Sequence, residues 1–352
     1  MSLSERKLQV LRAVVEDYVA TASPVGSRTL ARKYGLGFSP ATIRNEMADL
    51  EGLGYLEQPH TSAGRIPSDK GYRLYVDALM QVQQLAEAES KRIRRLYARR
   101  AVEVEAVVRE TVHLLSESTN CLSLLLGPRL GSMSFRWARL LPVDGDVALL
   151  VLVSGGNLVE HRFLTFPPGI SGEEAEAACS VLNERLRGKS LQEIASSLVM
   201  DLRLELRRYQ SLAEGALAML WQSMGGEDET GRVLVGGTAE ILNQPEFQDA
   251  RRTRALLAAL DRARLVRELL SQPLPGGQAS VAIGAEIGRS EVSDCSLVTA
   301  PYCLGGREVG QIGVLGPKRM PYARIMAVVT EVAVALGAAL SGAPGGRQGG
   351  AS

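Results

Sequence analysis

Apolar residues recur at helical spacing in three consecutive segments near the start of the chain. The first segment, 4–20, opens with a serine that can cap a helix, and the second, 27–34, stops before a glycine. The third segment, 40–53, follows Ser39, a favourable N-cap residue, and is closed by Gly54. Three short helices separated by turns are typical of a helix-turn-helix module.

The third predicted helix has two chemically different faces. One face repeats large apolar side chains that should be buried, namely Ile43, Met47, Leu50 and Leu53. The opposite face is small and polar, with Arg44 and Asn45 flanked by Ala41 and Ala48. Arg and Asn are the side chains suited to paired hydrogen bonds with guanine and adenine in the major groove. This face is our candidate for base recognition, and the alternative is a solvated or protein-binding surface.

A short hairpin follows this helix. A strand opens at 55–56, the segment 59–65 forms the tip, and 66–67 return the chain. We expect Gly64 to adopt a positive φ, and we expect the polar side chains of the tip to donate hydrogen bonds to phosphates. Helices and hairpin together predict a winged helix-turn-helix at 1–80. The candidate DNA contacts are Arg28, Ser39, Thr42, Arg44, Asn45, His60, Thr61, Ser62 and Arg65.

The charge of this module is nearly balanced. Residues 1–80 contain ten Lys and Arg and nine Asp and Glu, which gives a net charge of +1. Neutralised phosphates supply most of the sequence-independent affinity for DNA, so one such module should have only modest affinity. Specific binding should therefore need two modules. A further basic stretch could approach the DNA backbone, although such a run usually forms a solvated face. It comprises Lys91, Arg92, Arg94, Arg95, Arg99 and Arg100.

The rest of the chain predicts two further modules. A helix is expected to begin at 71–79, helical composition persists from 82 to 117, and a strand is expected at 122–126. A three-stranded antiparallel meander is expected at 135–141, 147–153 and 159–166, followed by helices at 173–187, 191–198 and 202–221. Later strands are expected at 231–236, 279–283, 296–301 and 309–315, and a closing helix at 322–340. The meander and its helices thus interrupt one larger sheet domain, whose helices we place on one side of the sheet.

Composition is that of a folded chain with two or three domains: 352 residues, 45% hydrophobic and 22% charged. The first residues lack the apolar core of a secretory signal, and the late apolar segment 325–340, which contains Glu331, is too short to span a bilayer. The four cysteines are Cys121, Cys179, Cys295 and Cys303. They lack metal-binding spacing, which predicts reduced, buried thiols and a cytoplasmic protein. Cys295 and Cys303 could lie on neighbouring strands.

Catalytic chemistry is not indicated by any motif. The three histidines, at positions 60, 113 and 161, stand in no metal-binding or catalytic pattern. Gly188-Lys189-Ser190 is similar to the end of a phosphate-binding loop, but Asn183 stands where the first glycine is needed. We interpret this segment as a helix break. We therefore expect no enzymatic activity, no cofactor and no metal.

One long stretch, 15–77, closely resembles the HrcA-type heat-inducible transcription repressors of bacteria. The match is long and specific, and it includes the run SPATIRNEMADLEGLGYLEQPHTSAGRIPSDKG at 39–71. The resemblance continues weakly through LNQPEF at 242–247, and strongly through DCSLVTAPY at 294–302 and GVLGPKRM at 313–320. The resemblance therefore includes segments near both ends of the chain.

This resemblance implies an α+β chain of several domains. They are a winged helix-turn-helix domain at 1–80, a helical linker at 81–100, a GAF-like domain at 101–130 and 226–341, and an inserted dimerisation domain at 131–225. The glycine-rich tail at 342–352 is expected to be disordered from its composition. The resemblance also implies a homodimer that binds an inverted-repeat operator in double-stranded DNA before chaperone operons, without membrane contact. Heat stress would relieve the repression, and a chaperonin would maintain the active state. The alternative, which the sequence disfavours only weakly, is a winged-helix regulator with a small effector bound in the GAF-like domain.

Overall fold

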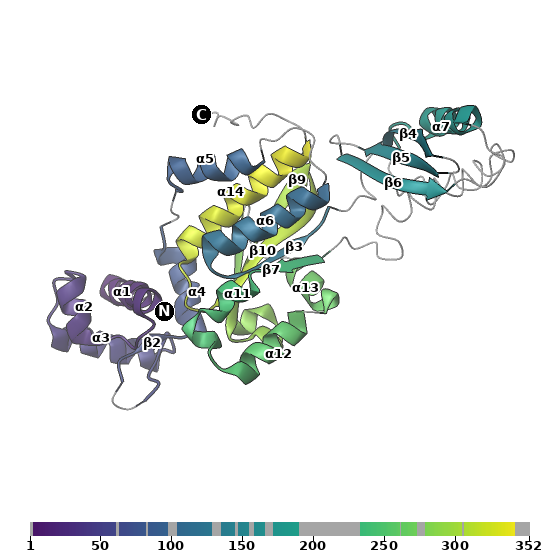
Figure 1. Ribbon diagram of the computed structural model, residues 1–352. Coiled ribbons are helices and arrows are strands. Elements are labelled where there is room, and N and C mark those ends of the chain that lie inside the picture. The colour runs from purple at the N-terminus through teal and green to yellow at the C-terminus, as the bar shows by residue number, and fades with distance from the viewer. Residues whose placement is uncertain are drawn as a thin grey trace, which may run out of the picture.

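The computed structural model describes residues 3–60, 63–81, 84–97, 104–128, 135–144, 147–154, 158–165, 172–189, 233–260, 262–272, 279–304 and 306–341. The predicted helices at 191–198 and 202–221 lie outside these ranges, as do Thr61, Ser62, Arg99, Arg100 and the tail 342–352. Figure 1 shows an N-terminal helical module, a central sheet covered by helices, and a separate small sheet. The chain is an α+β protein.

The N-terminal module contains the three predicted helices and the hairpin. Its elements are α1 (Glu5–Thr21), α2 (Ser27–Lys33), α3 (Pro40–Gly52), β1 (Leu56–Glu57) and β2 (Ile66–Pro67), and the two strands pair antiparallel. Ser4 and Ser39 cap α1 and α3 as predicted, because each side chain accepts a hydrogen bond from the backbone N–H three residues later. The predicted buried stripe of α3 holds except at Leu53, which is 43% exposed. The helix ends at Gly52, and Gly54 at φ 78° turns the chain so that Leu56 becomes buried instead.

One more helix ends the N-terminal module: α4 (Asp69–Leu74), which continues as the π-helix η1 (Tyr75–Leu79). The next two helices, α5 (Glu87–Leu96) and α6 (Val104–Thr119), pack against the closing helix in the central domain. The basic stretch on α5 is largely paired with carboxylates. Lys91 bonds Glu87, Arg92 lies near Glu117, and Arg94 bonds Glu331 of the closing helix α14 (Tyr322–Ser341). These pairs favour a structural role for α5 over a contact with the DNA backbone.

The central sheet has five antiparallel strands in the order β7-β3-β10-β9-β8. Their bounds are β3 (Leu122–Leu126), β7 (Val233–Gly236), β8 (Ser280–Ile283), β9 (Cys295–Leu304) and β10 (Arg307–Pro317), which confirms every predicted strand of this sheet within the described residues.

Helices cover both faces of the sheet, so the expectation of helices on one side was wrong. Alternate residues of β3 join different cores, with Leu125 packed towards α6 and α14 and Leu124 packed towards the opposite layer. That second layer comprises α11 (Thr238–Leu242), η5 (Pro245–Phe247), α12 (Ala250–Leu260), α13 (Ala263–Leu270), η6 (Gly284–Ile287) and η7 (Ser290–Val292). Strands that are apolar on both faces require two covering layers.

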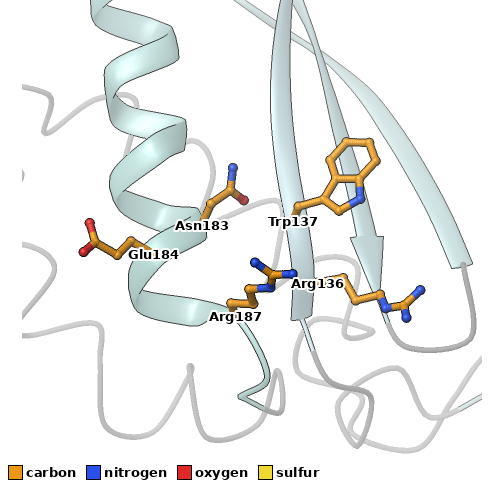
Figure 2. Close-up of a pocket in the computed structure, with 5 residues that line it drawn as sticks. All are labelled: Arg136, Trp137, Asn183, Glu184 and Arg187. Atoms are coloured by element: carbon orange, nitrogen blue, oxygen red, sulfur yellow. The ribbon is translucent and has the colours of Figure 1, made fainter.

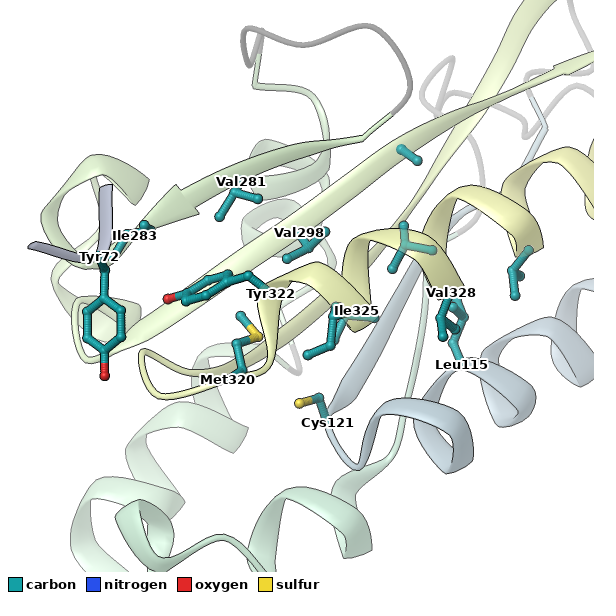
Figure 3. Close-up of a cluster of buried hydrophobic side chains, with 14 of the residues drawn as sticks. Tyr72, Leu115, Cys121, Val281, Ile283, Val298, Met320, Tyr322, Ile325 and Val328 are labelled. Carbon is teal, nitrogen blue, oxygen red and sulfur yellow. The ribbon is translucent and has the colours of Figure 1, made fainter. Parts of the chain in front are cut away.

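The closing helix α14 is long and apolar enough to cross a membrane by length and composition alone, contrary to the sequence argument. Its packing accounts for this composition. Ten of its residues are buried, and Figure 3 shows Tyr322, Ile325 and Val328 within the core between helix and sheet. Glu331 accepts a hydrogen bond from Arg94 at 2.7 Å. The helix is therefore the core helix of the central domain.

The small sheet, which we call the insert, confirms the predicted meander. Strands β4 (Phe135–Asp144), β5 (Val147–Ser154) and β6 (Leu158–Thr165) pair antiparallel in that order, and α7 (Gly172–Leu186) packs against β4. The Asn183 side chain bonds both the N–H and the carbonyl of Ala138, at 2.6 and 2.9 Å. Gly188, at φ 80°, lies just after α7, and its N–H bonds the Phe135 carbonyl. The Gly188-Lys189 segment is thus a helix end, as expected.

The cysteines are free thiols, and three of the four are buried. Burial raises the pKa of Cys121 and of Cys295 to about 12, so both stay protonated at neutral pH. Cys303 is exposed and lies on the same strand as Cys295, β9. The expectations that Cys303 is buried and that the two thiols lie on neighbouring strands were wrong, because β9 is longer than the sequence predicted.

Candidate nucleic-acid interface

The outer face of α3 is open to solvent. Arg44 and Asn45 are exposed, as are Ala41 and Ala48 on either side of them. No hydrogen bond or ion pair engages the Arg44 or Asn45 side chain within the described part of the chain. The opposite side of α3 is fixed in the module's core by its buried apolar residues. The helix therefore presents two unengaged polar side chains from a rigid position, which is the arrangement that base recognition needs.

The carboxylates of α3 are tied to cations of the same module. Lys7 of α1 bonds Glu46 at 2.8 Å and Asp49 at 2.9 Å, and Glu51 bonds Arg65 at 2.7 Å. Hydrogen bonds to Asp49 and Glu46 raise the pKa of Lys7 above its ordinary value, so the ammonium is charged at neutral pH. Pairing neutralises the acidic groups that would otherwise repel a phosphate backbone.

The amino end of α3 also suits an anion. The Ser39 hydroxyl accepts the Thr42 N–H at 3.1 Å and lies 2.9 Å from the Thr42 hydroxyl. This pair fixes the cap, while the positive end of the helix dipole points outwards at Ser39, which is exposed. Arg28 of α2 is exposed as well and has no ion-pair partner among the described residues. Ser39 and Arg28 therefore remain candidates for phosphate contacts.

The hairpin differs from the prediction at its base. His60 is exposed near the tip, where its carbonyl accepts the Ala63 N–H at 2.8 Å. Gly64 does not have a positive φ. A glycine is needed there for a different reason, because a Cβ at Gly64 would lie 2.3 Å from the Val25 carbonyl oxygen. Thr61 and Ser62 lie outside the described residues.

Arg65 lies beside β2 at the base of the hairpin and not at its tip. Its backbone exchanges two hydrogen bonds of 2.9 Å with Val25, which makes Val25 a third strand position in this small sheet. Its guanidinium bonds the Glu51 carboxylate, and the side chain is only 19% exposed. Glu51 already neutralises part of its charge, so Arg65 is a weaker candidate for phosphate binding than its sequence position indicates.

The remaining surface of the described residues offers little catalytic chemistry. No group of three or more His, Cys, Asp or Glu side chains is placed to hold a metal there. A cavity of about 700 Å³ lies on the insert, where Figure 2 shows Arg136, Trp137, Asn183, Glu184 and Arg187 on β4 and α7. A second cavity of about 610 Å³ lies along α11, η5 and α12.

Known proteins resemble this chain over nearly its whole length. The family described as HrcA protein C terminal domain matches residues 105–326. The heat-inducible transcription repressor HrcA of Pelotomaculum thermopropionicum is 43% identical over 329 residues, which are 94% of each chain. That of Symbiobacterium thermophilum is 44% identical over 331 residues, which are 94% of this chain and 97% of the relative.

One crystal structure also shares the fold. It is described as that of a hypothetical protein, and it matches with a TM-score of 0.71 and 26% sequence identity. The match covers 97% of this chain and 99% of that one. The arrangement of N-terminal module, central sheet and insert therefore occurs in an experimentally determined structure.

Proposed function

The chain belongs to the HrcA family and is a heat-inducible transcription repressor, and from this premise we propose that its N-terminal module is a winged helix-turn-helix whose α3 reads base edges. The outer face of α3 carries this proposal. Arg44 and Asn45 extend from a helix anchored on its other side, and neighbouring cations neutralise its carboxylates. An Arg beside an Asn supplies the donors and the acceptor that recognise guanine and adenine.

Phosphate contacts surround this reading face in the proposed complex. They come from the cap of α3, from α2 and from the hairpin, and the residues are Arg28, Ser39, Thr42, His60, Thr61, Ser62 and Arg65. Such contacts position the module but do not distinguish sequences. Because several cations of the module are already paired with carboxylates, we expect modest non-specific affinity and a correspondingly shallow dependence on salt.

The insert forms the dimer in this proposal. The sheet of the insert carries four large apolar side chains that are each at least 40% exposed, namely Trp137, Leu141, Val143 and Phe163. Monomeric soluble proteins rarely leave an apolar patch of this kind uncovered. A second copy that covers it gives a homodimer with two α3 helices, which together read an inverted repeat of two half-sites. Linking two weak modules raises their affinity for a paired site by about 10² to 10⁴.

Heat response follows from the same surface. We propose that warming separates the protomers in the cytoplasm and uncovers the apolar face of the insert, so that the chaperone operons are released from repression. An uncovered apolar face is prone to aggregation and is the kind of surface that a chaperonin protects. The five-stranded sheet between two helical layers supports a GAF-like central domain that connects insert and N-terminal module. No step of this function requires a chemical reaction.

The proposal is tested by gel retardation with full-length protein and no added small molecule. Inverted-repeat duplexes selected from a random pool by this protein serve as probes, with scrambled duplexes of the same composition for comparison. We expect retardation of the selected duplex by wild type and by Asn243→Ala, an exposed asparagine outside the module, but a large loss with Asn45→Ala. Equal binding to selected and scrambled duplexes would contradict the proposal, and retardation only after a small molecule is added would favour the effector-sensing alternative.

A further inference from the structure

The N-terminal module docks on the central domain around one aromatic contact. Tyr72 of α4 and Tyr322 at the start of α14 meet edge to face, with ring centroids 5.9 Å apart and an interplanar angle of 60°. Both rings are almost completely buried, at 2% and 1% exposure. Figure 3 shows Tyr72 near Tyr322 and Met320, at one end of the core that continues into the central domain. The module therefore shares a continuous core with the central domain.

One arginine joins this contact to two other segments. Arg319 lies in the loop between β10 and α14, and its side chain is only 14% exposed. Its guanidinium bonds Glu246 at 2.7 and 3.3 Å, Gln244 at 3.3 Å, and the carbonyl of Val19 at 2.9 Å. Gln244 lies in the loop that follows α11, and Glu246 lies in η5.

The bond to Val19 places a positive charge at the carboxyl end of α1. The last carbonyls of a helix lack partners within the helix, and cations there interact favourably with its dipole. The last turn of α1 contains no basic residue of its own. Arg319 supplies from the central domain both the hydrogen bond and the charge that this helix end lacks.

The neighbouring residue holds a different helix of the same module. Lys318 bonds Asp69 at the start of α4, at 2.7 Å. Farther along α4, Arg73 bonds Glu286 and the carbonyl of Val281, the latter at 2.7 Å. Two consecutive residues of one loop thus hold α1 and α4 separately. Restraints on two helices fix the orientation of a module, whereas a single contact leaves it free to rotate.

The aromatic contact provides packing but no hydrogen bond from Tyr72. The Tyr72 hydroxyl is buried and has no hydrogen-bond partner among the described residues, and burial raises the pKa of Tyr72 well above its ordinary value. A buried hydroxyl without a partner costs free energy. The hydrogen bonds and ion pairs across this contact come from the charged groups around the rings, and among them Arg319 is the most buried side chain.

We propose that Arg319 is a positioning residue that fixes the angle of the DNA-binding module on the central domain and thereby sets the half-site spacing that the dimer accepts. This inference rests on the proposed function of α3 and of the insert. In a dimer, the distance between the two α3 helices depends on every contact between domains that connects them. The contact at Arg319, between the central domain and the N-terminal module, is the last of these before each α3. If this contact is weakened, α3 can reach half-sites at several separations.

The experiment measures affinity as a function of spacing. The probes are the selected inverted-repeat duplex, the same duplex with its central spacer changed by about two to five base pairs, up to half a helical turn, and a duplex with one half-site. The proteins are full-length wild type, Arg319→Gln, Arg319→Lys and Glu246→Gln. Arg324→Gln is the matched control, because Arg324 pairs with Glu89 of α5 within the central domain at 3.0 Å.

Wild type and Arg324→Gln should lose about a hundredfold in affinity when the spacing is changed, since avidity is lost if geometry forbids simultaneous binding. Arg319→Gln should bind the original duplex about tenfold more weakly, should discriminate less than about fivefold between spacings, and should bind the single half-site like wild type. Arg319→Lys and Glu246→Gln should discriminate between spacings less than wild type but more than Arg319→Gln, because each keeps part of the hydrogen bonding.

Loss of folded protein lowers binding to every duplex by the same factor, so it does not change the ratio between spacings. An Arg319→Gln profile that matches wild type would overturn the inference, as would equal weakening on all duplexes and on the half-site. If Arg319→Gln does not fold, the profile of Glu246→Gln decides in the same way. Failure of the proposed function is distinct: wild type itself would then show no preference for an inverted repeat.

Discussion

The backbone of Gly64 passes so close to Val25 that no side chain fits between them. An added Cβ would lie 2.3 Å from the carbonyl oxygen and 2.5 Å from the carbonyl carbon of Val25. Both are backbone atoms, and Val25 is 99% buried, so neither can rotate away. Gly64→Ala must therefore open the bridge between Val25 and Arg65. The strain is steric, since the φ of Gly64 is not in the left-handed region.

The cost can be worked from the two bonds of that bridge. The Val25 and Arg65 N–H groups each donate to the other residue's carbonyl at 2.9 Å. Each backbone hydrogen bond contributes about 1 kcal/mol net, and displaced packing adds to this, so we expect about 2–3 kcal/mol of local destabilisation. Since 1.4 kcal/mol corresponds to a factor of ten, these two amides should exchange roughly 30- to 150-fold faster.

Hydrogen exchange of the full-length chain, followed by mass spectrometry of peptides that contain Val25 or Arg65, measures this change. Gly52→Ala is the control, because Gly52 lies at the end of α3 with no atom within 4 Å of its added Cβ. It should leave exchange unchanged or slow it slightly, as alanine favours helix over glycine by about 1 kcal/mol. Amides of α14 should not respond to either change. Unaltered protection in Gly64→Ala would refute the steric argument.

Three further predictions concern DNA binding and assembly. Asn45→Ala should cost about 1–3 kcal/mol on the selected duplex and almost nothing on scrambled DNA, which titrations on both duplexes would measure. Arg65→Ala should reduce the slope of log K against log salt by less than one unit, because Glu51 already neutralises part of its charge; a full unit lost would show a direct phosphate contact. Phe163→Asp should convert the proposed dimer to a monomer in sedimentation, whereas Val334→Asp, at an equally exposed position (63%) on α14, should not.

Local chemistry explains why much of the N-terminal module could be predicted from the sequence. The cap at Ser39 and the turn at Gly54 depend on residues within a few positions, so their signals are contained in the sequence itself. The central strands could also be predicted, because short runs of apolar residues bounded by turn residues favour strands. The three helices between 238 and 270 were not predicted. Their apolar residues at helical spacing, among them Leu256, Leu260 and Leu269, were the signal that could have identified them.

Contacts between segments that are far apart in the chain could not be predicted from the sequence. Arg65 looked like a free cation at a hairpin tip, yet it pairs with Glu51 fourteen residues earlier. Arg319 stood in a run shared with a known family, yet nothing in that run indicated a bond to the end of α1, 300 residues away. Such pairs have no period along the sequence. Only the fold determines which charges meet, and residue spacing does not encode that.

The near-zero net charge of the module is a case where counting charges misleads. What a phosphate experiences is the local potential, and this depends on where each charge lies and on what pairs with it. Glu46 and Asp49 are held by Lys7 on the side of α3 that faces α1, whereas Arg44 extends from the exposed face without a partner among the described residues. The reading face can therefore be positive while the module as a whole is almost neutral. Weak attraction elsewhere also disfavours random DNA, so in the proposed dimer specificity would rest on two correctly spaced reading faces.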